Sequence, residues 1–292
     1  MFRAIAIILS LLAAVALAFG AQFQNDSVEK NIDKVKGEKH GVGFANILKL
    51  IRSPRWLGGM SFLVLGALCQ IAALTMAPLI VVQPIGALAL VITSLLNARS
   101  TKTAITKGTW IAIALCTGGI ATFVTLATGI AQDQRELSDA NLYVILGILA
   151  FLLIALGTVF LVQRQRMSAL TFILGAGLLY GLLATLVKSV IQRIQQSHFD
   201  WLTIICLIAA VLAMALGGWF VQNAYASGPP DLVIAGLTVI DPMVAVTIGI
   251  IVLGEASSAS PLISVVFAAS GATAALGVWL LSRVHPELKA QR

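Results

Sequence analysis

A carboxylate stands beside a proline in the middle of a long hydrophobic segment. Asp241 and Pro242 lie within residues 232–253, which hold no other charged side chain. An ionisable group at the centre of a membrane-spanning helix costs about 2.5–3.5 kcal/mol, so it is usually retained for function. Pro242 lacks an amide hydrogen and crowds the carbonyl of Thr238, which predicts a kink beside the carboxylate. Asp241 is predicted to carry a proton, bind a cation or pair with a cationic substrate; the alternative is a structural polar group satisfied by neighbouring helices.

A second proline follows a polar residue in a similar frame, 158 residues earlier. Gln83 precedes Pro84, and an amide oxygen there can coordinate a cation or accept a hydrogen bond from a polar substrate. We expect Gln83 to lie opposite Asp241 in one site. Three further amides lie inside or at the ends of apolar segments, where hydrogen bonding between helices is the preferred interpretation. They are Gln70, Gln222 and Asn223.

Three other polar side chains are weaker candidates for the site. Lys188 lies near the end of its apolar segment, where its ammonium is expected to snorkel to the interface. Glu255 ends a helix and is expected to be solvated, and Tyr180 is a candidate to line a pathway. Asp241 is the candidate metal ligand if a cation is the substrate. One carboxylate with several amides could pass hydrated magnesium, but it offers few ligands for a dehydrated ion.

The composition places these residues in a membrane. The chain has 292 residues, of which 59% are hydrophobic and 11% charged, whereas soluble domains carry about 25% charged residues. The net charge of +7 resides in short connectors, so it does not indicate nucleic-acid binding. Three widely spaced cysteines predict neither disulfides nor a zinc site. The predicted core has no paired carboxylates and no nucleophile–base set, so neither an enzyme nor a bound cofactor is predicted.

Hydrophobic segments long enough to cross a bilayer occur nine times, which predicts an all-α integral membrane protein with about nine transmembrane helices. Pro78 is the expected break in the long apolar run 56–97. The first segment could also pass for a signal peptide, but we expect it to be retained. The nine expected spans are residues 4–22, 57–76, 79–97, 109–130, 142–162, 169–188, 201–222, 232–253 and 261–282.

Basic residues predict how these helices are oriented. Nine spans place the termini on opposite sides, and fifteen of the nineteen Lys and Arg residues then lie on the C-terminal side. The excess of positive charge on cytoplasmic loops predicts a plasma (inner) membrane protein with its N-terminus outside. The polar loop 23–56 then lies in the cytoplasm. Its apolar residues from Phe44 to Ile51 predict either an interfacial amphipathic helix or a plain linker, and re-entry of residues 41–56 would change the orientation of the first helix.

The two prolines belong to a faint internal repeat. Pro84 and Pro242 match at an offset of 158 residues, and Pro78 and Pro230 match at an offset of 152. The matched spans run in opposite directions, and inverted repeats with broken helices indicate a transporter with a site near the bilayer midplane. We expect a four-helix half over residues 1–131, a five-helix half over 141–283 and a cytoplasmic tail over 284–292. The expected helix-break residues are Pro78, Pro84, Pro230 and Pro242.

Several of these motifs also resemble a known family. Ala77-Pro78, the run Val-Gln-Pro-Ile-Gly-Ala-Leu over residues 82–88 and Leu-Cys-Thr-Gly-Gly over 115–119 resemble NIPA-type magnesium transporters of the drug/metabolite transporter (DMT) superfamily. Gln83 stands where that family usually has threonine, and Asp241-Pro242 replaces a more aromatic segment. The resemblance implies a DMT (EamA-like) fold of two inverted halves, with one helix missing from the first half.

Together these observations predict a secondary transporter that moves a small solute by alternating access. A divalent cation such as magnesium is one substrate class, and the alternative is a proton-coupled exporter of a small metabolite or drug. A non-transporting scaffold or accessory subunit is the second alternative. A flippase for a lipid-linked intermediate would require a basic lateral opening, which the sequence does not offer. The expected partners are the lipid bilayer, the solute or cation and a second copy in a homodimer, and no nucleic acid is expected.

Overall fold

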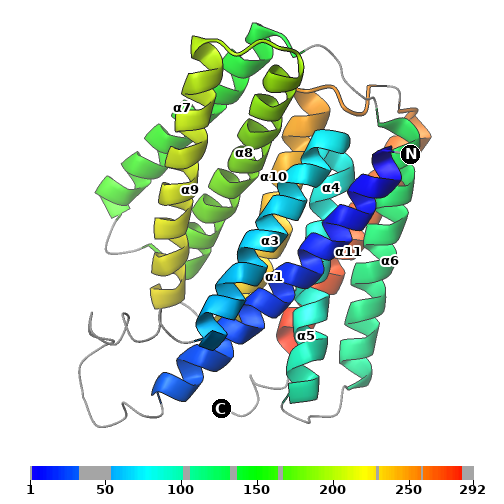
Figure 1. Cartoon of the computed structure of the whole chain (residues 1–292), viewed down its shortest axis with the longest axis vertical. Helices are drawn as coiled ribbons and strands as arrows, with labels where there is room; N and C mark the ends of the chain where they lie inside the picture. The colour runs from blue at the N-terminus through cyan, green and yellow to red at the C-terminus, as the bar shows by residue number, and fades with distance from the viewer. Residues whose placement is uncertain are drawn as a thin grey trace.

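The computed structural model describes residues 2–32, 54–100, 106–131, 137–163, 167–227, 230–257 and 259–284, and in these ranges it consists of helices and short turns (Figure 1). Nine stretches of the described helices are long and apolar enough to cross a membrane. The predicted all-α membrane protein is therefore confirmed. The helices are α1 (Phe2–Ile32), α3 (Pro54–Met76), α4 (Leu79–Gly86), α5 (Leu88–Ser100), α6 (Lys107–Ile130), α7 (Asp139–Gln163), α8 (Ala169–Gln195), α9 (Trp201–Ser227), α10 (Pro230–Ile251) and α11 (Pro261–Val284).

The helices cross the bundle in alternating directions, so the start of α1 and the end of α11 lie at opposite ends of the molecule (Figure 1). One end of the bundle holds the start of α1, the turn between α3 and α4, and the end of α10. The opposite end holds the start of α3, the end of α5 and the end of α11. For clarity we call the first of these the N-terminal end of the bundle.

The proline at the α3–α4 turn behaves as expected. α3 ends at Met76, and Pro78 has the extended backbone of a helix N-cap (φ −64°, ψ 159°), after which α4 begins. Pro84 lies inside α4, which ends two residues later at Gly86, and α5 begins at Leu88. One expected span is thus built from two short helices joined at Ala87.

The corresponding break in the second half is not formed. α10 starts at Pro230 and runs through Pro242 to Ile251 as one helix. A mid-helix proline costs one hydrogen bond and crowds one carbonyl, and α10 tolerates both. The prediction of a helix break at Pro242 is therefore wrong, whereas the start at Pro230 agrees with the expected boundary.

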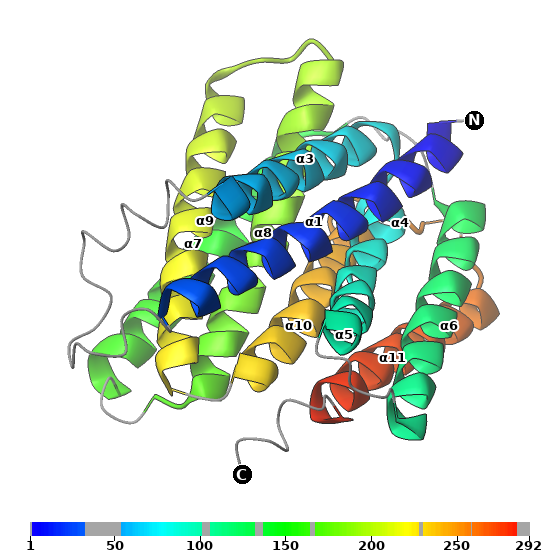
Figure 2. The same ribbon diagram turned by 60° about the horizontal axis from the view of Figure 1, so that its bottom comes forward.

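Helices approach each other closely where they carry small residues. A Cβ on Gly66 would lie 2.8 Å from the Leu17 side chain, which locates the contact between α1 and α3. The α6–α11 crossing is equally close, since a Cβ on Gly119 would lie 2.9 Å from the carbonyl of Ser270. Small residues allow this kind of approach in membranes, where packing replaces the hydrophobic effect between helices. Figure 2 shows α6 and α11 together at one side of the bundle, and α7, α8 and α9 at the other.

The first helix is longer than expected. α1 continues to Ile32, ten residues beyond the predicted span. The extra turns carry the polar sequence from Gln24 onward, and helical geometry needs no apolar surroundings once the chain has left the bilayer core. The predicted interfacial helix after Phe44 falls outside the described residues.

Candidate functional site

Asp241 lies on the face of α10 that packs against α8. Two glycines of α8 make this contact close: a Cβ on Gly181 would lie 2.9 Å from the carbonyl oxygen of Asp241, and a Cβ on Gly177 would overlap the Ile240 side chain. The Oδ1 atom of Asp241 is buried and has no hydrogen-bond partner in the described part of the chain. A buried carboxylate oxygen without a partner is costly. It is the kind of group that binds a proton or a cation.

Tyr180 brings a third helix to this carboxylate. Its ring, half-buried on α8, packs against Gly217 of α9, where an added Cβ would lie 2.7 Å from Cε1. Tyr180 directly precedes Gly181, the glycine that contacts the backbone of Asp241. A phenol can donate a hydrogen bond to a carboxylate or accept one from a hydrated ion. The expectation that Tyr180 lines a pathway stays a prediction.

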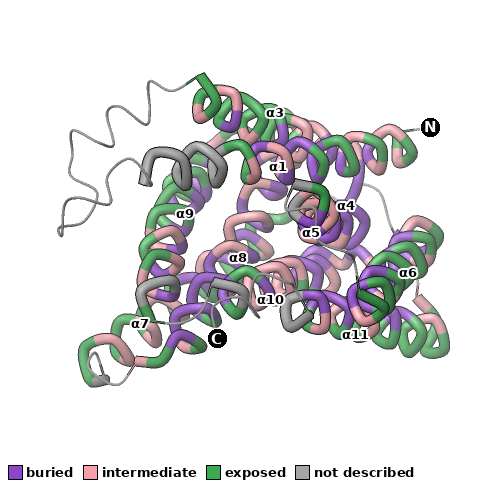
Figure 3. The backbone as a smooth tube through the Cα atoms, turned by 90° about the horizontal axis from the view of Figure 1, so that it is seen from below, coloured by how far each residue is buried: buried purple, intermediate pink, exposed green. Residues whose placement is uncertain are grey.

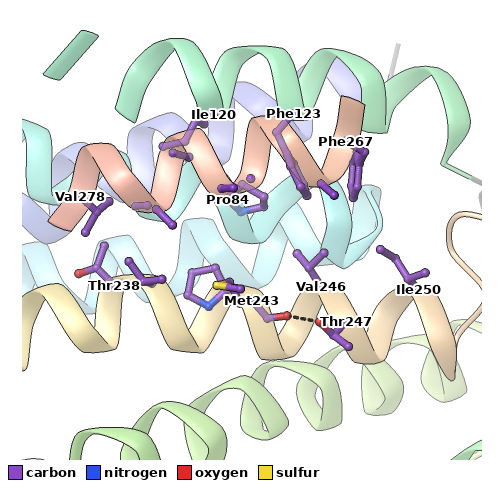
Figure 4. A pocket seen from close by; sticks show the side chains of 18 residues that line it. Pro84, Ile120, Phe123, Thr238, Met243, Val246, Thr247, Ile250, Phe267 and Val278 are labelled. Atoms are coloured by element: carbon purple, nitrogen blue, oxygen red, sulfur yellow. Dashed lines mark hydrogen bonds between the residues drawn. The ribbon is translucent and has the colours of Figure 1, made fainter. Parts of the chain in front are cut away.

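The opposite face of α10 borders an apolar cavity of about 350 Å³ (Figure 4). Side chains of α4, α6, α10 and α11 line it, and both Pro84 and Pro242 are among them. Its two polar side chains are already engaged, because Thr238 and Thr247 each donate a 2.7 Å hydrogen bond to a carbonyl of their own helix. The cavity therefore offers a mainly apolar surface, on which the two hydroxyl groups have already used their donor hydrogens. α10 thus separates a carboxylate on one face from an apolar hollow on the other.

Lys188 and Glu255 hold the turn between α3 and α4. Lys188 Nζ donates to the carbonyls of Leu74 (2.6 Å) and Ala77 (2.9 Å), at the end of α3. Glu255 Oε1 and Oε2 accept from the amides of Leu79 (2.9 Å) and Ile80 (3.0 Å), at the start of α4. Each charge therefore meets the helix end of opposite sign.

These contacts overturn two expectations. Lys188 does not reach the interface and Glu255 is not solvated, because only 6% and 4% of their surfaces are exposed. Burial raises the pKa of Glu255 above its ordinary value, while the two amides and the Lys188 charge oppose that change. Gly254, with φ of 68°, turns the chain at the end of α10 and thereby places Glu255 beside α4. The Gly-Glu pair was visible in the sequence, but its partner 176 residues away was not.

The four predicted amides lie on three different helices, α3, α4 and α9. Gln83 is buried on α4, and no hydrogen bond joins it to Asp241 among the described residues. Gln70 is on α3, where its Oε1 atom is buried and finds no hydrogen-bond partner among the residues that the structure describes. Gln222 is exposed, and Asn223 donates to the carbonyl of Trp219 on its own helix. The last two therefore lie on the surface of α9 near its C-terminal end.

Arg193 and Arg3 form contacts that were not predicted from the sequence. Arg193 is buried and pairs with Asp139 (2.6 Å) and Asp200 (2.7 Å), which ties the ends of α7, α8 and α9 together. Asp200 also accepts from the amide of Thr203 (3.0 Å), as an N-cap of α9. These Thr203 bonds, together with the Arg193 charge, lower the pKa of Asp200. The Asp-x-x-Thr spacing was a usable signal for this cap.

Arg3 is the second of these arginines. It donates to the carbonyls of Thr128 and Ala131 at the C-terminal end of α6. A guanidinium stabilises a helix C-terminus because the last carbonyls have no partner within the helix. The first helix is thereby joined both to α3 and to α6.

No cluster of three or more His, Cys, Asp or Glu side chains that could hold a metal ion occurs among the described residues. Asp241 with its neighbouring phenol is consequently a one-carboxylate site. Magnesium commonly retains several waters and binds through one or two carboxylates, so the arrangement is compatible with a hydrated ion and not with a fully dehydrated one.

Comparison with known proteins identifies the family. The family model for the magnesium transporter NIPA matches residues 3–194, which cover α1 to nearly the end of α8. The chain belongs to the NIPA magnesium transporter family. The resemblance carried by residues 77–119 is thereby confirmed. The NIPA match includes Gln83, Tyr180 and Lys188, whereas Asp241 and Glu255 lie beyond it.

Two relatives extend the similarity into the second half. An uncharacterized protein of Corynebacterium glutamicum is 24% identical over 256 residues, 86% of this chain and 85% of the relative. A probable magnesium transporter of Arabidopsis thaliana, NIPA9, is 24% identical over 229 residues, 73% of this chain and 66% of the relative. No solved structure matches the chain.

Proposed function

We propose that this NIPA-family protein is a secondary transporter that carries magnesium across the plasma (inner) membrane by alternating access. Membership in the family supports a membrane transporter and argues against an enzyme. The name of the Arabidopsis relative supports magnesium as the substrate. The ion passes with part of its hydration shell, since one carboxylate cannot replace six ligands.

The observation that carries this proposal is the unpaired Oδ1 atom of Asp241. It is buried between α8 and α10 in the interior of a membrane span, where an ionisable group without a partner is expensive. Binding a cation or a proton removes that cost. A carboxylate that gains its partner only from the substrate or coupling ion is well suited to a transport cycle.

The packing of the helices supports two inverted halves. α1 packs on α3 as α8 packs on α9, and α6 packs on α11 at one side of the bundle. α3 and its matched helix α9 run in opposite directions (Figure 1). In this scheme α7 has no counterpart, so it is the helix that the first half lacks. The halves are residues 1–131 and 141–283, and their relative rocking would expose Asp241 to each side in turn.

Orientation follows from charge. We place the N-terminal end of the bundle outside the cell, because most of the basic residues belong to the opposite end. The turn held by Lys188 and Glu255 is then at the outer end.

Figure 3, a view from the other end, shows α1, α5, α8 and α10 surrounding the centre of the molecule.

Flux measurements on purified protein in liposomes test the proposal. We expect magnesium uptake that exceeds uptake by protein-free liposomes, and a loss on the order of tenfold or more in Asp241→Asn. Asp241→Glu, which keeps a carboxylate at this position, is the matched control and should retain flux. If Asp241→Asn transports magnesium as fast as the unchanged protein, the role of the carboxylate is wrong. Absence of flux of any solute would favour a scaffold or accessory subunit.

The apolar cavity favours a second candidate, a proton-coupled exporter of a small apolar metabolite or drug. A cavity of about 350 Å³ lined almost wholly by apolar side chains suits such a solute and not a hydrated ion. In this case Asp241 carries the proton. A pH gradient would then drive efflux of apolar cations or neutral compounds, whereas magnesium flux would be absent. Substitution of Met243, which lines the cavity, by Gln would then reduce that efflux. If the protein carries magnesium instead, the same substitution should leave magnesium flux unaltered.

A further inference from the structure

Both helix ends at the α3–α4 turn are satisfied by side chains from the other half of the chain. The last carbonyls of α3 lack donors within their helix, and Lys188 of α8 donates to two carbonyls at this end. The first amides of α4 lack acceptors within their helix, and Glu255, which follows α10, accepts from two of them. The turn itself contributes neither of these caps.

The two charges also depend on the turn. Both side chains are almost fully buried, and a buried charge is tolerated only when it is paired and hydrogen-bonded. Their charges attract each other, but each also needs its helix end. Withdrawing the turn would therefore remove two hydrogen-bond acceptors from the buried ammonium and two donors from the buried carboxylate.

Further contacts support the same junction. Gln195 Nε2, at the end of α8, donates to the carbonyl of Thr75 (2.9 Å). Gly249 provides the room that Glu255 requires, because a Cβ there would lie 2.7 Å from Oε2 and 3.4 Å from Leu79 Cβ. Thus α8, the end of α10 and the loop that follows it close on one turn of the first half.

We propose that Lys188 and Glu255 form a clamp that closes this end of the transport pathway, and that the clamp must release for the end to open. This inference rests on the proposed alternating access. The clamp positions α4, and Gln83 lies only one helical turn beyond the amide of Leu79. Lys188 and Glu255 therefore act through the α3–α4 turn, as positioning residues, and do not serve as ligands of the solute.

Thiol accessibility measures the clamp without any substrate. We would replace Cys69, Cys116 and Cys206 by Ala, introduce Ala77→Cys beneath the clamp, and label the protein in lipid nanodiscs with a polar maleimide. Lys188→Met and Glu255→Gln each remove a charge at nearly constant size. We expect either substitution to accelerate labelling on the order of tenfold. Leu79→Cys gives a second reporter at the other side of the turn.

A buried cysteine elsewhere separates clamp release from unfolding. Ala213, fully buried on α9, provides that control, and Ala213→Cys should stay protected in every variant. If labelling rises equally at both positions, the substitutions unfold the bundle and the clamp is wrong. If labelling at residues 77 and 79 does not change, the clamp is also wrong.

Charge reversal distinguishes a clamp on helix ends from a simple ion pair. In the double variant Lys188→Glu with Glu255→Lys, a carboxylate faces carbonyls and an ammonium faces amides. We therefore expect labelling to remain fast, even though the two charges are still opposite. Restoration of the slow rate would show that the pair acts alone and would overturn the helix-end clamp. Absence of flux from the unchanged protein would overturn the proposed function, while these labelling rates would still report on the clamp.

Discussion

α4 and α10 both carry a proline near the middle of a membrane span, yet only the first is interrupted. α4 ends at Gly86, two residues after Pro84, whereas α10 continues for nine residues after Pro242. The difference lies downstream of the proline. Gly86 lowers the helix propensity of the next turn, and the amide of Ala87 turns back to the carbonyls of Pro84 and Ile85. α10 has Val244 at the position of Gly86.

The surroundings differ as well. α4 is buried through its first turns and is held at its start by Glu255. α10 is held along its length by α8, through Gly177 and Gly181, and borders the cavity on its other face. The comparison teaches that a proline marks a weak point, while the neighbouring glycine and the packing decide whether the helix ends there.

The largest effect is expected where α10 meets α8. In Gly181→Ala the new Cβ would lie 2.5 Å from Val244 Cβ and 2.9 Å from the carbonyl oxygen of Asp241, so α10 must shift. We expect a loss of about 3 kcal/mol in stability, measured by thermal denaturation in detergent. Gly147→Ala on α7, where nothing lies within 4 Å, is the control. An unaltered stability would mean that α10 is not held by α8.

A smaller loss is expected where α4 is held at its start. Gly249→Ala would push Glu255 away from the amides of Leu79 and Ile80 without altering any charge. We expect a cost of about 2 kcal/mol, since two amides lose a charged acceptor. The same denaturation measurement applies. The cost should disappear in the Glu255→Gly background, and its persistence there would assign it to another contact.

A substitution at the interruption between α4 and α5 should change the stability by less, and should raise it. Gly86 has no atom within 4 Å of an added Cβ, so Gly86→Ala introduces no clash. We expect a gain of about 0.5–1 kcal/mol as the residue becomes a better helix former. Magnesium flux should fall if the break between α4 and α5 moves during transport. A loss of stability would show that the interruption is set by packing and not by the glycine.

The smallest effect is expected for Asp200, which caps the helix that directly follows it in the chain, whereas Glu255 caps a distant helix. The pKa of Asp200 is lowered by its bonds to Thr203 and by Arg193. Its contribution to stability is therefore present above the ordinary pKa of an aspartate and is lost as the pH falls through the lowered value. When the melting temperature is measured over a series of pH values, it should fall slightly less steeply toward acid pH in Asp200→Asn than in the unchanged protein. The same acid dependence in both proteins would mean that Asp200 does not cap α9.

Much of this architecture could be predicted from residue patterns. Apolar runs of about twenty residues predicted the spans, because backbone groups in lipid must be satisfied within a helix. Pro78 located the α3–α4 turn correctly. Pro242 misled the prediction, since the rule for proline says nothing about the α8 glycines that hold α10 in place. Helix ends are local, whereas the persistence of a weakened helix depends on distant packing.

The polar residues were harder to assign. Lys188 and Glu255 were read as solvent-facing because each lies near a span end, where water is usually available. Both instead meet another helix end, and such a pairing has no signature within a single sequence. The Oδ1 atom of Asp241 is buried, as the place of this residue in an apolar run suggested, since that place is a local property; the role of Asp241 stays a prediction. The relation of Gln83 to Asp241 remains a prediction.

The cap on α4 also sets an order of events during synthesis. Glu255 follows Leu79 by 176 residues. At roughly 5–20 residues per second, the carboxylate leaves the ribosome about 9–35 s after the amide that it will cap. Lys188 follows Leu74 by only 114 residues, so the end of α3 can be capped before the start of α4. The start of α4 is therefore capped only when the connection from α10 to α11 has been made, and a chain truncated before Glu255 would display this uncapped helix end to the quality-control proteases of the membrane.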